Sequence, residues 1–399
     1  MTAAQEEAPA LLRSLTDAAR AVGLRDAVGL EALEEREAAR SALAAVTRGD
    51  LTRWTVPERD GGAAAGGLCA PDAVSVRALC ALRDELAWHS GMLDVMLVMQ
   101  GLGSYPVALG GSNELREQVL PEVALGRMIG AFALTEPDAG SSLGEVSTRA
   151  VRSGDEWVLN GGKTFISNAG IASFYSVLAR TDGEPGDREP SGGGPGNLTM
   201  FWIPANARGL ETRPFEVMAP HPIGDVLFHD VRIPDGHRLG EVGGGLDVAL
   251  GTLSRFRTSV AAAACGFARR ALDESCRRLT ARSQFGKPLS AFQGLRFDLA
   301  EMDVRLRAAQ LLVAEAGAAV DNGEASPAEV ARAKLFGTET ASWICDRAVQ
   351  HFGGLGVKRG VVVERLFRDV RALRIYEGTS EVQKLILAKE VLERASPAR

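Results

Sequence analysis

Hydrophobic residues recur with a helical period near both ends of the chain. Residues 31–46, EALEEREAARSALAAV, are rich in strong helix formers, and residues 71–100 open with Pro71 and carry a broad apolar face. Further on, six apolar positions recur at steps of four and three, which places them on one helical face: Leu295, Leu299, Met302, Leu306, Ala309 and Val313. Both ends of the chain are therefore predicted to be helical.

A helix start signal supports a bundle in the C-terminal part. In SPAE, residues 326–329, Ser326 suits the N-cap, Pro327 suits the first helical position, and Glu329 completes a capping box. Three or four long helices with this patterning pack into a bundle.

The pattern changes near residue 129. Short runs of β-branched and aromatic residues, separated by Gly, Pro and Asn, are typical of strands and turns. The runs are EWVLNGGKTFIS (156–167), FYSVLART (174–181), LTMFWIPA (198–205) and DVLFHDVRIP (225–234). The Gly- and Pro-rich residues 182–197 are expected to form a mobile surface loop. The prediction is a mainly α protein with a middle β-domain, divided into 1–128 (helical), 129–238 (β) and 239–399 (helical bundle).

Composition excludes several classes of partner. The 399 residues carry a net charge of −6 with both signs mixed, so the basic stripe that nucleic acid requires is missing. The five cysteines lack CxxC spacing and the five histidines lack metal-ligand spacing. The acidic N-terminus does not resemble a targeting peptide, and no apolar run approaches the roughly 20 residues of a membrane span. We expect a cytoplasmic protein with reduced, mostly buried thiols, no structural metal, no nucleic-acid partner and no membrane partner.

Two stretches of the middle part have a functional and a structural interpretation. ALTEPDAGSS (133–142) is a polar turn whose backbone amides, with Thr135 and Ser141, suit a pyrophosphate or a ring edge, but it also suits a plain loop. In KTFISNAG, Phe165 and Ser167 share one side of a predicted strand. That arrangement fits a flat cofactor or ordinary core packing, and the residues alone do not separate the two.

Two C-terminal stretches are similarly open. RSQFGKPLSAFQ (282–293) breaks a helix at Phe285 and Gly286, and Arg282 suits either a phosphate or a solvated helix end. QHFGGLG (350–356) is a glycine-rich turn that would let the backbone approach a cofactor closely, although glycine pairs also end helices. The chain contains neither GxSxG nor a P-loop, which argues against a hydrolase or a kinase.

Taken together and in order, these motifs resemble the acyl-CoA dehydrogenase family of flavoproteins. LTEPDAGSS resembles the family's TEPxAGSD loop, and LNGGKTFISNAG resembles its NGxKxxIsN strand pair. RSQFGKPLSAFQ, QHFGGLGV, VERLFRDVR and IYEGTSEVQ match its C-terminal signatures. The resemblance implies an N-terminal helical domain, a β-barrel-like domain and a C-terminal four-helix bundle. It also implies a homo-oligomer, usually a dimer of dimers.

The resemblance further implies an FAD cofactor. The flavin and pyrophosphate side would use Phe132, Leu134, Thr135, Gly140, Ser141, Phe165 and Ser167. The side contributed by a neighbouring subunit would use Arg282, Ser283, Gln284, Phe285, Phe292, Gln293, Gln350, Gly353 and Gly354. The adenosine half would contact Thr379, Ser380 and Glu381. The chain departs from the family where Phe165 replaces a common tryptophan and Ser142 replaces the usual aspartate.

By the same resemblance, Glu377 is the base that removes the α-proton of an acyl thioester while flavin N5 accepts the β-hydride. Burial beside Tyr376 and the ligand is expected to raise the pKa of Glu377. Some family members place the base on another helix, where this chain has Phe256, and this favours Glu377. Arg257 aligns with the family's arginine near the thioester and the base. Substrate contacts are implied for Ser141, Ser254, Arg255, Arg257, Gly378 and Lys389.

Several alternatives stay open from the sequence. The acyl group could be carried by CoA or by an acyl-carrier protein, and its length, branching or ring is undetermined. The implied electron acceptor is an electron-transfer flavoprotein. An acyl-CoA oxidase of the same fold, a non-redox β-elimination on an acyl thioester, and an inactive binding protein are the competing hypotheses. Flavin monooxygenases of this fold generally lack the glutamate.

Overall fold

The computed structural model describes residues 3–181 and 197–395, so the predicted loop at 182–197 lies outside the described residues except for its last residue. The chain forms two compact units, which are described separately. Unit 1 comprises Met1–Ala27, Val76–Asp94 and Arg257–Arg399, and unit 2 comprises Val28–Ser75 and Val95–Phe256. The predicted domain boundaries after residues 128 and 238 stay predictions.

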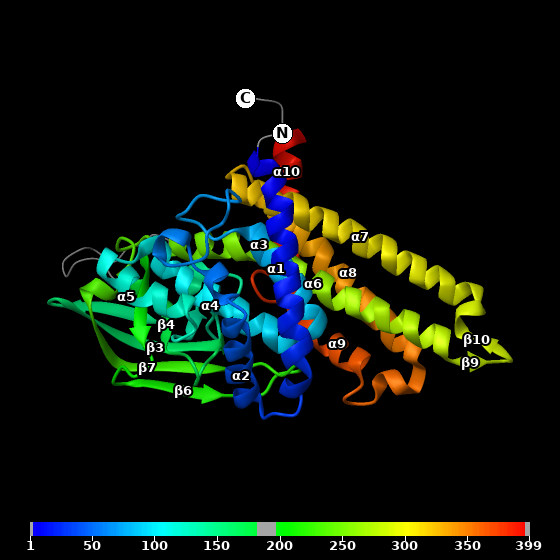
Figure 1. Cartoon of the computed structure of the whole chain (residues 1–399). Coiled ribbons are helices and arrows are strands. Elements are labelled where there is room, and N and C mark those ends of the chain that lie inside the picture. The colour runs from blue at the N-terminus through cyan, green and yellow to red at the C-terminus, as the bar shows by residue number, and fades with distance from the viewer. Residues whose placement is uncertain (1–2, 182–196, 396–399) are drawn as a thin grey trace. The chain divides into compact units, whose positions relative to one another are not determined.

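Unit 1 is built mainly from helices. They are α1 (Ala3–Leu30), α3 (Val76–His89), α6 (Gly245–Ala281, from Arg257 on), α7 (Gln293–Asn322), α8 (Pro327–Phe352), α9 (Val362–Arg371) and α10 (Ser380–Ala395). In Figure 1, α6, α7 and α8 run side by side within this unit. Their core contains the predicted apolar face of α7, in which Met302, Leu306, Ala309 and Val313 are buried.

The two predicted helix starts had different outcomes. The capping box at Ser326 and Glu329 is confirmed, with α8 beginning at Pro327. The helix expected from Pro71 begins instead at Val76 and ends at His89, and a second helix, α4 (Gly91–Gly110), follows it. The reason is tertiary, because the Asp321 carboxylate on α7 accepts the backbone N–H groups of Val76 and Arg77 at 2.7 and 3.1 Å. A carboxylate from another helix thus caps α3.

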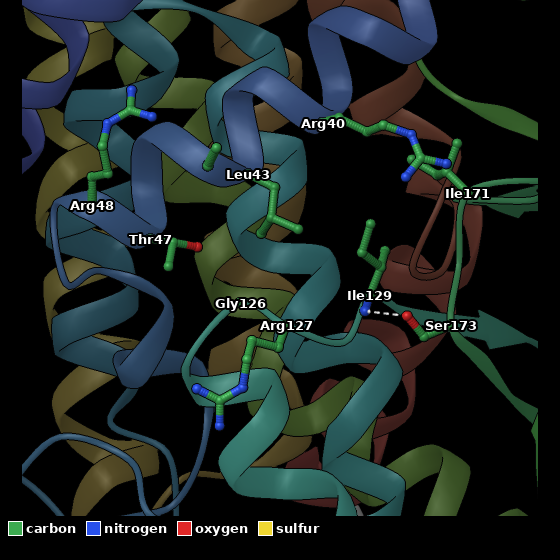
Figure 2. Close-up of a pocket in the computed structure, with 10 residues that line it drawn as sticks. Arg40, Leu43, Thr47, Arg48, Gly126, Arg127, Ile129, Ile171 and Ser173 are labelled. Carbon is green, nitrogen blue, oxygen red and sulfur yellow. Dashed lines mark hydrogen bonds between the residues drawn. The ribbon is translucent and has the colours of Figure 1, made fainter.

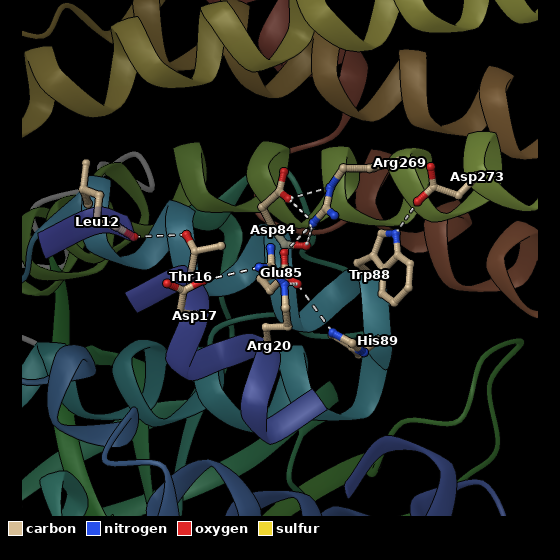
Figure 3. Close-up of polar contacts among 10 residues, drawn as sticks. All are labelled: Leu12, Thr16, Asp17, Arg20, Asp84, Glu85, Trp88, His89, Arg269 and Asp273. Atoms are coloured by element: carbon tan, nitrogen blue, oxygen red, sulfur yellow. Dashed lines mark hydrogen bonds and ion pairs between the residues drawn. The ribbon is translucent and has the colours of Figure 1, made fainter. Parts of the chain in front are cut away.

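A polar network joins α1, α3 and α6 within unit 1 (Figure 3). The buried Glu85 accepts from Arg20 at 3.0 Å and from Arg269 at 2.9 Å. Burial alone would raise the pKa of Glu85, but hydrogen bonds from His89 and Arg20 and the charge of Arg269 lower it to about 2. Next to it, Arg270 lies over the ring of Trp88, 4.3 Å from its centroid. These contacts are structural, because every charged group shown has a partner inside the network.

Unit 2 carries the sheet. Besides α2 (Glu35–Arg48), α5 (Asn113–Ala124) and parts of α4 and α6, it contains β1 (Gly130–Ala133), β2 (Arg149–Ser153), β3 (Glu156–Ser167), β4 (Phe174–Thr181), β5 (Leu198–Pro204), β6 (Leu210–Pro214), β7 (Ile223–Pro234) and β8 (Arg238–Leu239). The described strands follow the order β6-β7-β3-β2-β4-β5-β8, with β1 parallel to β4 (Figure 1). All four predicted strand segments are confirmed. The fold class is confirmed as well.

Irregular pairing with β7 changes the direction of a side chain in β3. The pairing of β3 with β7 shifts register between Lys163 and Ile166, and Phe165 within this bulge has a φ of 55°. A bulge of this kind lets one side chain leave the regular alternation of faces. Phe165 is 61% exposed, while Ile166 is buried. Core packing is therefore not the role of the Phe165 ring.

The cysteines are unpaired with one another, and one long helix is apolar along its length. All five cysteines are free; Cys265 and Cys345 are buried and Cys276 is exposed. No group of three or more potential metal ligands occurs within residues 3–181 and 197–395. The expectation that no segment has the length of a membrane span is wrong for α4, which has an 18-residue window of mean hydropathy 1.3. That window is 89% buried, which is typical of a core helix.

Candidate active site

Glu377 lies in a short turn of unit 1. The turn joins a 3-10 helix, Ala372–Arg374, to α10. Glu377 has a φ of 52° and Gly378 a φ of 91°, so two consecutive residues are left-handed. In a residue other than glycine, this conformation costs on the order of 1–3 kcal/mol and persists only where the surroundings impose it. The neighbours of the turn must therefore hold Glu377 in place.

Side chains from three helices hold the carbonyl groups of this turn. Arg257 Nε, from α6, donates to the Glu377 carbonyl at 2.9 Å. Lys334 Nζ of α8 and Gln383 Nε2 of α10 both donate to the Gly378 carbonyl, at 2.7 and 2.9 Å. The φ of 91° favours glycine at position 378, and a Cβ there would lie 2.6 Å from Gln383 Nε2, so that the amide would have to shift. The structure thus brings together Glu377, Gly378 and Arg257, whose roles at the site stay predictions.

Two polar groups of Glu377 are left unpaired. Its Oε2 atom is shielded from solvent and has no hydrogen-bond partner, and its backbone N–H donates to no group among the described residues. Burial raises the pKa of Glu377, and the positive charges of Arg83, Arg257 and Lys334 oppose this rise. A carboxyl group with a raised pKa can exchange a proton near neutral pH, and the free N–H can donate to a ligand oxygen.

Arg83 is the buried cation that most strongly opposes the raised pKa of Glu377. It is 1% exposed and forms a two-bond ion pair with Asp94, at 2.7 and 2.8 Å, and its Nη1 donates to Ser259 at 2.9 Å. With its donors committed to Asp94 and Ser259, Arg83 acts on Glu377 through its charge rather than through direct bonding.

Sequence reasoning missed five residues that surround the turn: Arg83, Asp94, Ser259, Lys334 and Gln383. A signal for two of them was present. Lys334 stands on the buried face of α8 in line with Ala331 and Ala341, and Arg83 stands beside Leu79 and Leu82 on the buried face of α3. A charged residue at an apolar position of a helix needs a partner. That pattern indicates that a buried polar site is present, but it does not indicate which groups pair with these side chains.

In unit 2, the loop after β1 is fixed by a buried ion pair. Lys163 Nζ on β3 contacts Glu136 Oε1 at 2.7 Å and the Leu134 carbonyl at 2.9 Å. The Glu136 carboxylate also accepts from Ser147 and Thr148. The loop lies beside β3, because the Thr164 N–H donates to the Thr135 carbonyl at 2.9 Å. The predicted cofactor residues of the loop therefore lie next to the strand that carries Phe165 and Ser167.

The predicted residues of unit 2 are available to a ligand to different degrees. Ser141 and Gly140 are exposed, and nothing lies within 4 Å of a Cβ built on Gly140. Phe132 and Thr135 are half-buried, whereas the Leu134 side chain is buried.

Ser167 has a partner that the sequence did not suggest. Its hydroxyl lies 2.6 Å from His221 Nε2. Burial lowers the pKa of His221 to about 4, so this imidazole is neutral at pH 7. Phe165 packs edge-on against Phe215 with ring centroids 5.3 Å apart.

The predicted residues of the hairpin in unit 1 are exposed. β9 (Ser283–Gln284) and β10 (Lys287–Pro288) form a two-stranded hairpin whose tip residue, Phe285, is 92% exposed. Phe285 and Phe292 meet edge-on at 6.2 Å. Arg282 is exposed and forms no ion pair within the described part of the chain. Gln293, Gln350, Gly353 and Gly354 are exposed as well.

The remaining predicted residues differ in their exposure and in the contacts that they make with other side chains. Ser380 is buried and donates to Glu339 at 2.5 Å, while Thr379 is half-buried and Glu381 is exposed. Lys389 is exposed and lies 3.8 Å from Glu393. In unit 2, Ser254 is exposed and Arg255 hydrogen-bonds to Tyr105. Phe256 is fully buried against the ring of Tyr105.

A separate open pocket of about 500 Å³ lies in unit 2 (Figure 2). Arg40, Arg48 and Arg127 line it, together with Thr47 and Ser173. Ser173 already accepts the Ile129 N–H, and Arg127 already pairs with Glu122. None of the residues predicted for the cofactor or the substrate lines this pocket.

The comparisons identify the family. The acyl-CoA dehydrogenase C-terminal domain model matches residues 243–392, and the middle-domain model matches residues 131–231. The chain is 35% identical over 321 residues to cyclohexane-1-carbonyl-CoA dehydrogenase of Geobacter metallireducens, covering 80% of this chain and 82% of that protein. It is 37% identical over 319 residues to the CarC subunit of the caffeyl-CoA reductase–Etf complex of Acetobacterium woodii, covering 78% and 81%. The structure matches butyryl-CoA dehydrogenase of Megasphaera elsdenii with a TM-score of 0.85, 29% identity, and coverage of 98% and 99%.

The fold and these matches define a flavoprotein oxidoreductase that acts on CH–CH groups. The chain belongs to the acyl-CoA dehydrogenase family, which confirms the resemblance seen in the sequence.

The family's cofactor is FAD, and the residues present suit it. Gly140 is open, the Phe165 ring is exposed, and Arg282 forms no ion pair within the residues that the structure describes. These are the kinds of group that accept a pyrophosphate and a flat ring.

Proposed function

We propose that the chain interconverts an acyl thioester and its α,β-unsaturated counterpart, with Glu377 moving the α-proton. The observation that carries the proposal is the pair of unpaired groups on one residue: the shielded Oε2 atom and the free N–H of Glu377. A thioester needs both a base at its α-carbon and a donor at its carbonyl oxygen, because removing the α-proton creates enolate character.

The chain's residues would divide the work as follows. The Glu377 carboxylate takes the α-proton, and its own N–H donates to the thioester oxygen. Arg257 holds the Glu377 carbonyl and so fixes the direction of that N–H. When bound, FAD accepts the β-hydrogen as a hydride. The loop at 132–141, Phe165 and Ser167 would hold the flavin side, and Arg282 with the exposed hairpin would reach the cofactor of a neighbouring subunit in a homo-oligomer.

The direction of the reaction and its partners are parts of the proposal. One relative is named as a CoA-ester dehydrogenase and another as a CoA-ester reductase in an Etf complex. Since Glu377 can return the proton that it removes, the same site would serve either direction. The CoA ester is the favoured substrate over an acyl-carrier-protein ester, because the names of these relatives refer to CoA. An electron-transfer flavoprotein is the proposed electron partner.

The test is an anaerobic titration of the purified FAD-loaded protein, followed in the visible spectrum. A panel of acyl-CoA and acyl-carrier-protein thioesters with short, branched, cyclic and long acyl groups would be added to the oxidised protein, and the matching enoyl thioesters to the dithionite-reduced protein. Bleaching by an acyl thioester, or reoxidation by an enoyl thioester, is expected with one class. Product formation without any spectral change would indicate β-elimination, and peroxide formation in air would indicate an oxidase.

Glu377→Gln is the matched variant for this assay. It should keep FAD and fold but lose at least two orders of magnitude in the bleaching rate, because general-base catalysis contributes about 10²- to 10⁴-fold. Unchanged bleaching by Glu377→Gln would rule out Glu377 as the base.

A further inference from the structure

Lys334 is a buried cation whose role the reaction described above does not include. It stands on α8 with 0% exposure, and its Nζ donates to the Gly378 carbonyl at 2.7 Å. It forms no ion pair within the described residues. Burying an ammonium group against a neutral carbonyl is costly, and an uncharged side chain could fill the same space. The charge therefore calls for an explanation beyond packing.

The charged groups around Lys334 indicate that its positive charge interacts mainly with Glu377. Burial lowers the pKa of Lys334 to about 8, and the group that most opposes this is Glu377. Arg257 on α6 lowers the Lys334 pKa further, whereas Glu339 on α8 and Glu381 on α10 raise it. In turn, Arg83, Arg257 and Lys334 lower the pKa of Glu377, and Asp94 raises it. Lys334 and Glu377 thus stabilise each other's charged forms.

We propose that Lys334 is a positioning residue for Glu377: its ammonium group locks the carbonyl that follows the base and supplies a positive charge that keeps the base ionised. The inference rests on the proposed function of Glu377. Lys334 touches the backbone of the turn rather than the reacting atoms, so its effect passes through Glu377. Because Gln383 donates to the same carbonyl at 2.9 Å, removing Lys334 leaves that carbonyl satisfied. The turn can then persist while its charge environment changes.

Lys334→Met separates the two roles, because methionine fills a similar volume without charge. The control is Thr338→Val, one turn further along α8. Thr338 is also fully buried, and among the described residues its hydroxyl donates to the α8 carbonyls of Lys334 and Leu335 alone. Its loss tests whether any buried polar-to-apolar change in this helix has the same consequence. Melting temperature and FAD content would be measured for both variants.

The decisive readout is the pH dependence of the limiting rate of anaerobic flavin bleaching, with the thioester found in the titration. The limiting rate of Lys334→Met should fall roughly tenfold or more at pH 7, as misplacement of a reacting group by a fraction of an ångström does, while the thioester dissociation constant changes little. The acid limb of the profile should move to higher pH, since Glu377 then loses a proton less readily. The difference in limiting rate between Lys334→Met and the wild type should become smaller above pH 8, because Lys334 of the wild type is then neutral as well.

The outcomes separate this inference from the proposed function. If Glu377→Gln bleaches like the wild type, the function proposed for Glu377 fails. If Glu377→Gln is inactive but Lys334→Met keeps the wild-type rate and acid limb, the role of Lys334 is overturned. A loss of equal size in Thr338→Val, or a rate loss in Lys334→Met without any movement of the acid limb, would reduce Lys334 to a packing residue and would equally overturn the proposal.

Discussion

The buried ion pair beneath the loop of unit 2 allows a prediction with a calculable size. The variant is Glu136→Gln, which removes the carboxylate charge and keeps the shape. Glu136 is 3% exposed in its side chain and Lys163 is 0% exposed, so water does not screen the pair. Removing the carboxylate charge leaves the buried Lys163 ammonium group with neutral acceptors alone, the Leu134 carbonyl and the amide oxygen of the new side chain. Breaking a buried pair in this way is costly because one charge is left uncompensated.

The magnitude follows from the pKa of Glu136. Burial raises it, but the charge and hydrogen bond of Lys163, with those of Thr148 and Ser147, lower it from 4.5 to about 2. This difference of about 2.5 units corresponds to about 3 kcal/mol of folding stability at neutral pH. A loss of about 3 kcal/mol lowers the melting temperature by about 6–12 °C for a domain of this size. FAD retention should weaken as well if the loop holds the cofactor.

The sign of the pH dependence is fixed by the same shift. The pKa of Glu136 is depressed in the folded state, so its contribution is complete above pH 4.5 and is lost as the pH falls toward 2. Wild type and Glu136→Gln should therefore differ most near neutral pH and converge in acid. Thermal unfolding with excess FAD, at several scan rates because unfolding of such proteins is often irreversible, measures the difference.

Two further variants make the test specific. Glu156→Gln, on the same strand as Lys163, removes an exposed partner of Arg232 at 3.4 Å and should change the melting temperature by about 1 °C or less, since exposed pairs contribute little. The double variant Glu136→Gln/Lys163→Met removes both buried charges and should recover most of the loss. A Glu136→Gln shift no larger than that of Glu156→Gln, or a double variant no more stable than the single one, would refute the reasoning.

Two more predictions concern packing and pH. Asp321→Ala should lower the stability measured by thermal unfolding by about 2 kcal/mol, because the N–H groups of Val76 and Arg77 lose their cap. Asp321→Asn should restore only part of that loss, because the amide nitrogen that replaces one carboxylate oxygen cannot accept from an N–H group. His221→Gln should flatten the acid limb of stability between pH 6.5 and about 4: the pKa of His221 is lowered by burial to about 4, so below pH 6.5 only the unfolded state takes up the proton. Urea unfolding across that pH range measures this, and an unchanged slope would contradict it.

How much the sequence predicted depends on the range of the interaction. The α7 face and the capping box at Ser326 were predictable because each depends on residues that are close together in the sequence. The start of α3 was not, because its cap, Asp321, lies some 245 residues further along the chain. For the same reason the partners of the buried Arg83 and Lys334 could not be named from sequence, even though their positions on apolar faces marked them as unusual.

The same limit applies to the candidate site. The resemblance around Glu377 implied a base, which stays a prediction, and the structure adds that one oxygen of this carboxylate is shielded from solvent. The Ser167 hydroxyl contacts His221, which belongs to a segment with no recognisable motif. The sequence near either residue therefore did not indicate this contact. The bulge that exposes Phe165 depends on the pairing of β3 with β7, which a strand pattern alone does not specify.

In the turn at Glu377, the groups that neighbouring side chains bind are different from the groups that have no partner. All the donors found around the turn, from Arg257, Lys334 and Gln383, are directed at carbonyl oxygens. Glu377 is left-handed, and neither its N–H nor its Oε2 has a partner among the described residues. Strain and unsatisfied polar groups both oppose folding, and their occurrence on one residue supports the proposal that a ligand binds there. The thioester that we propose as the substrate, with one acidic C–H and one carbonyl oxygen, would present the two complementary groups in a single functional unit.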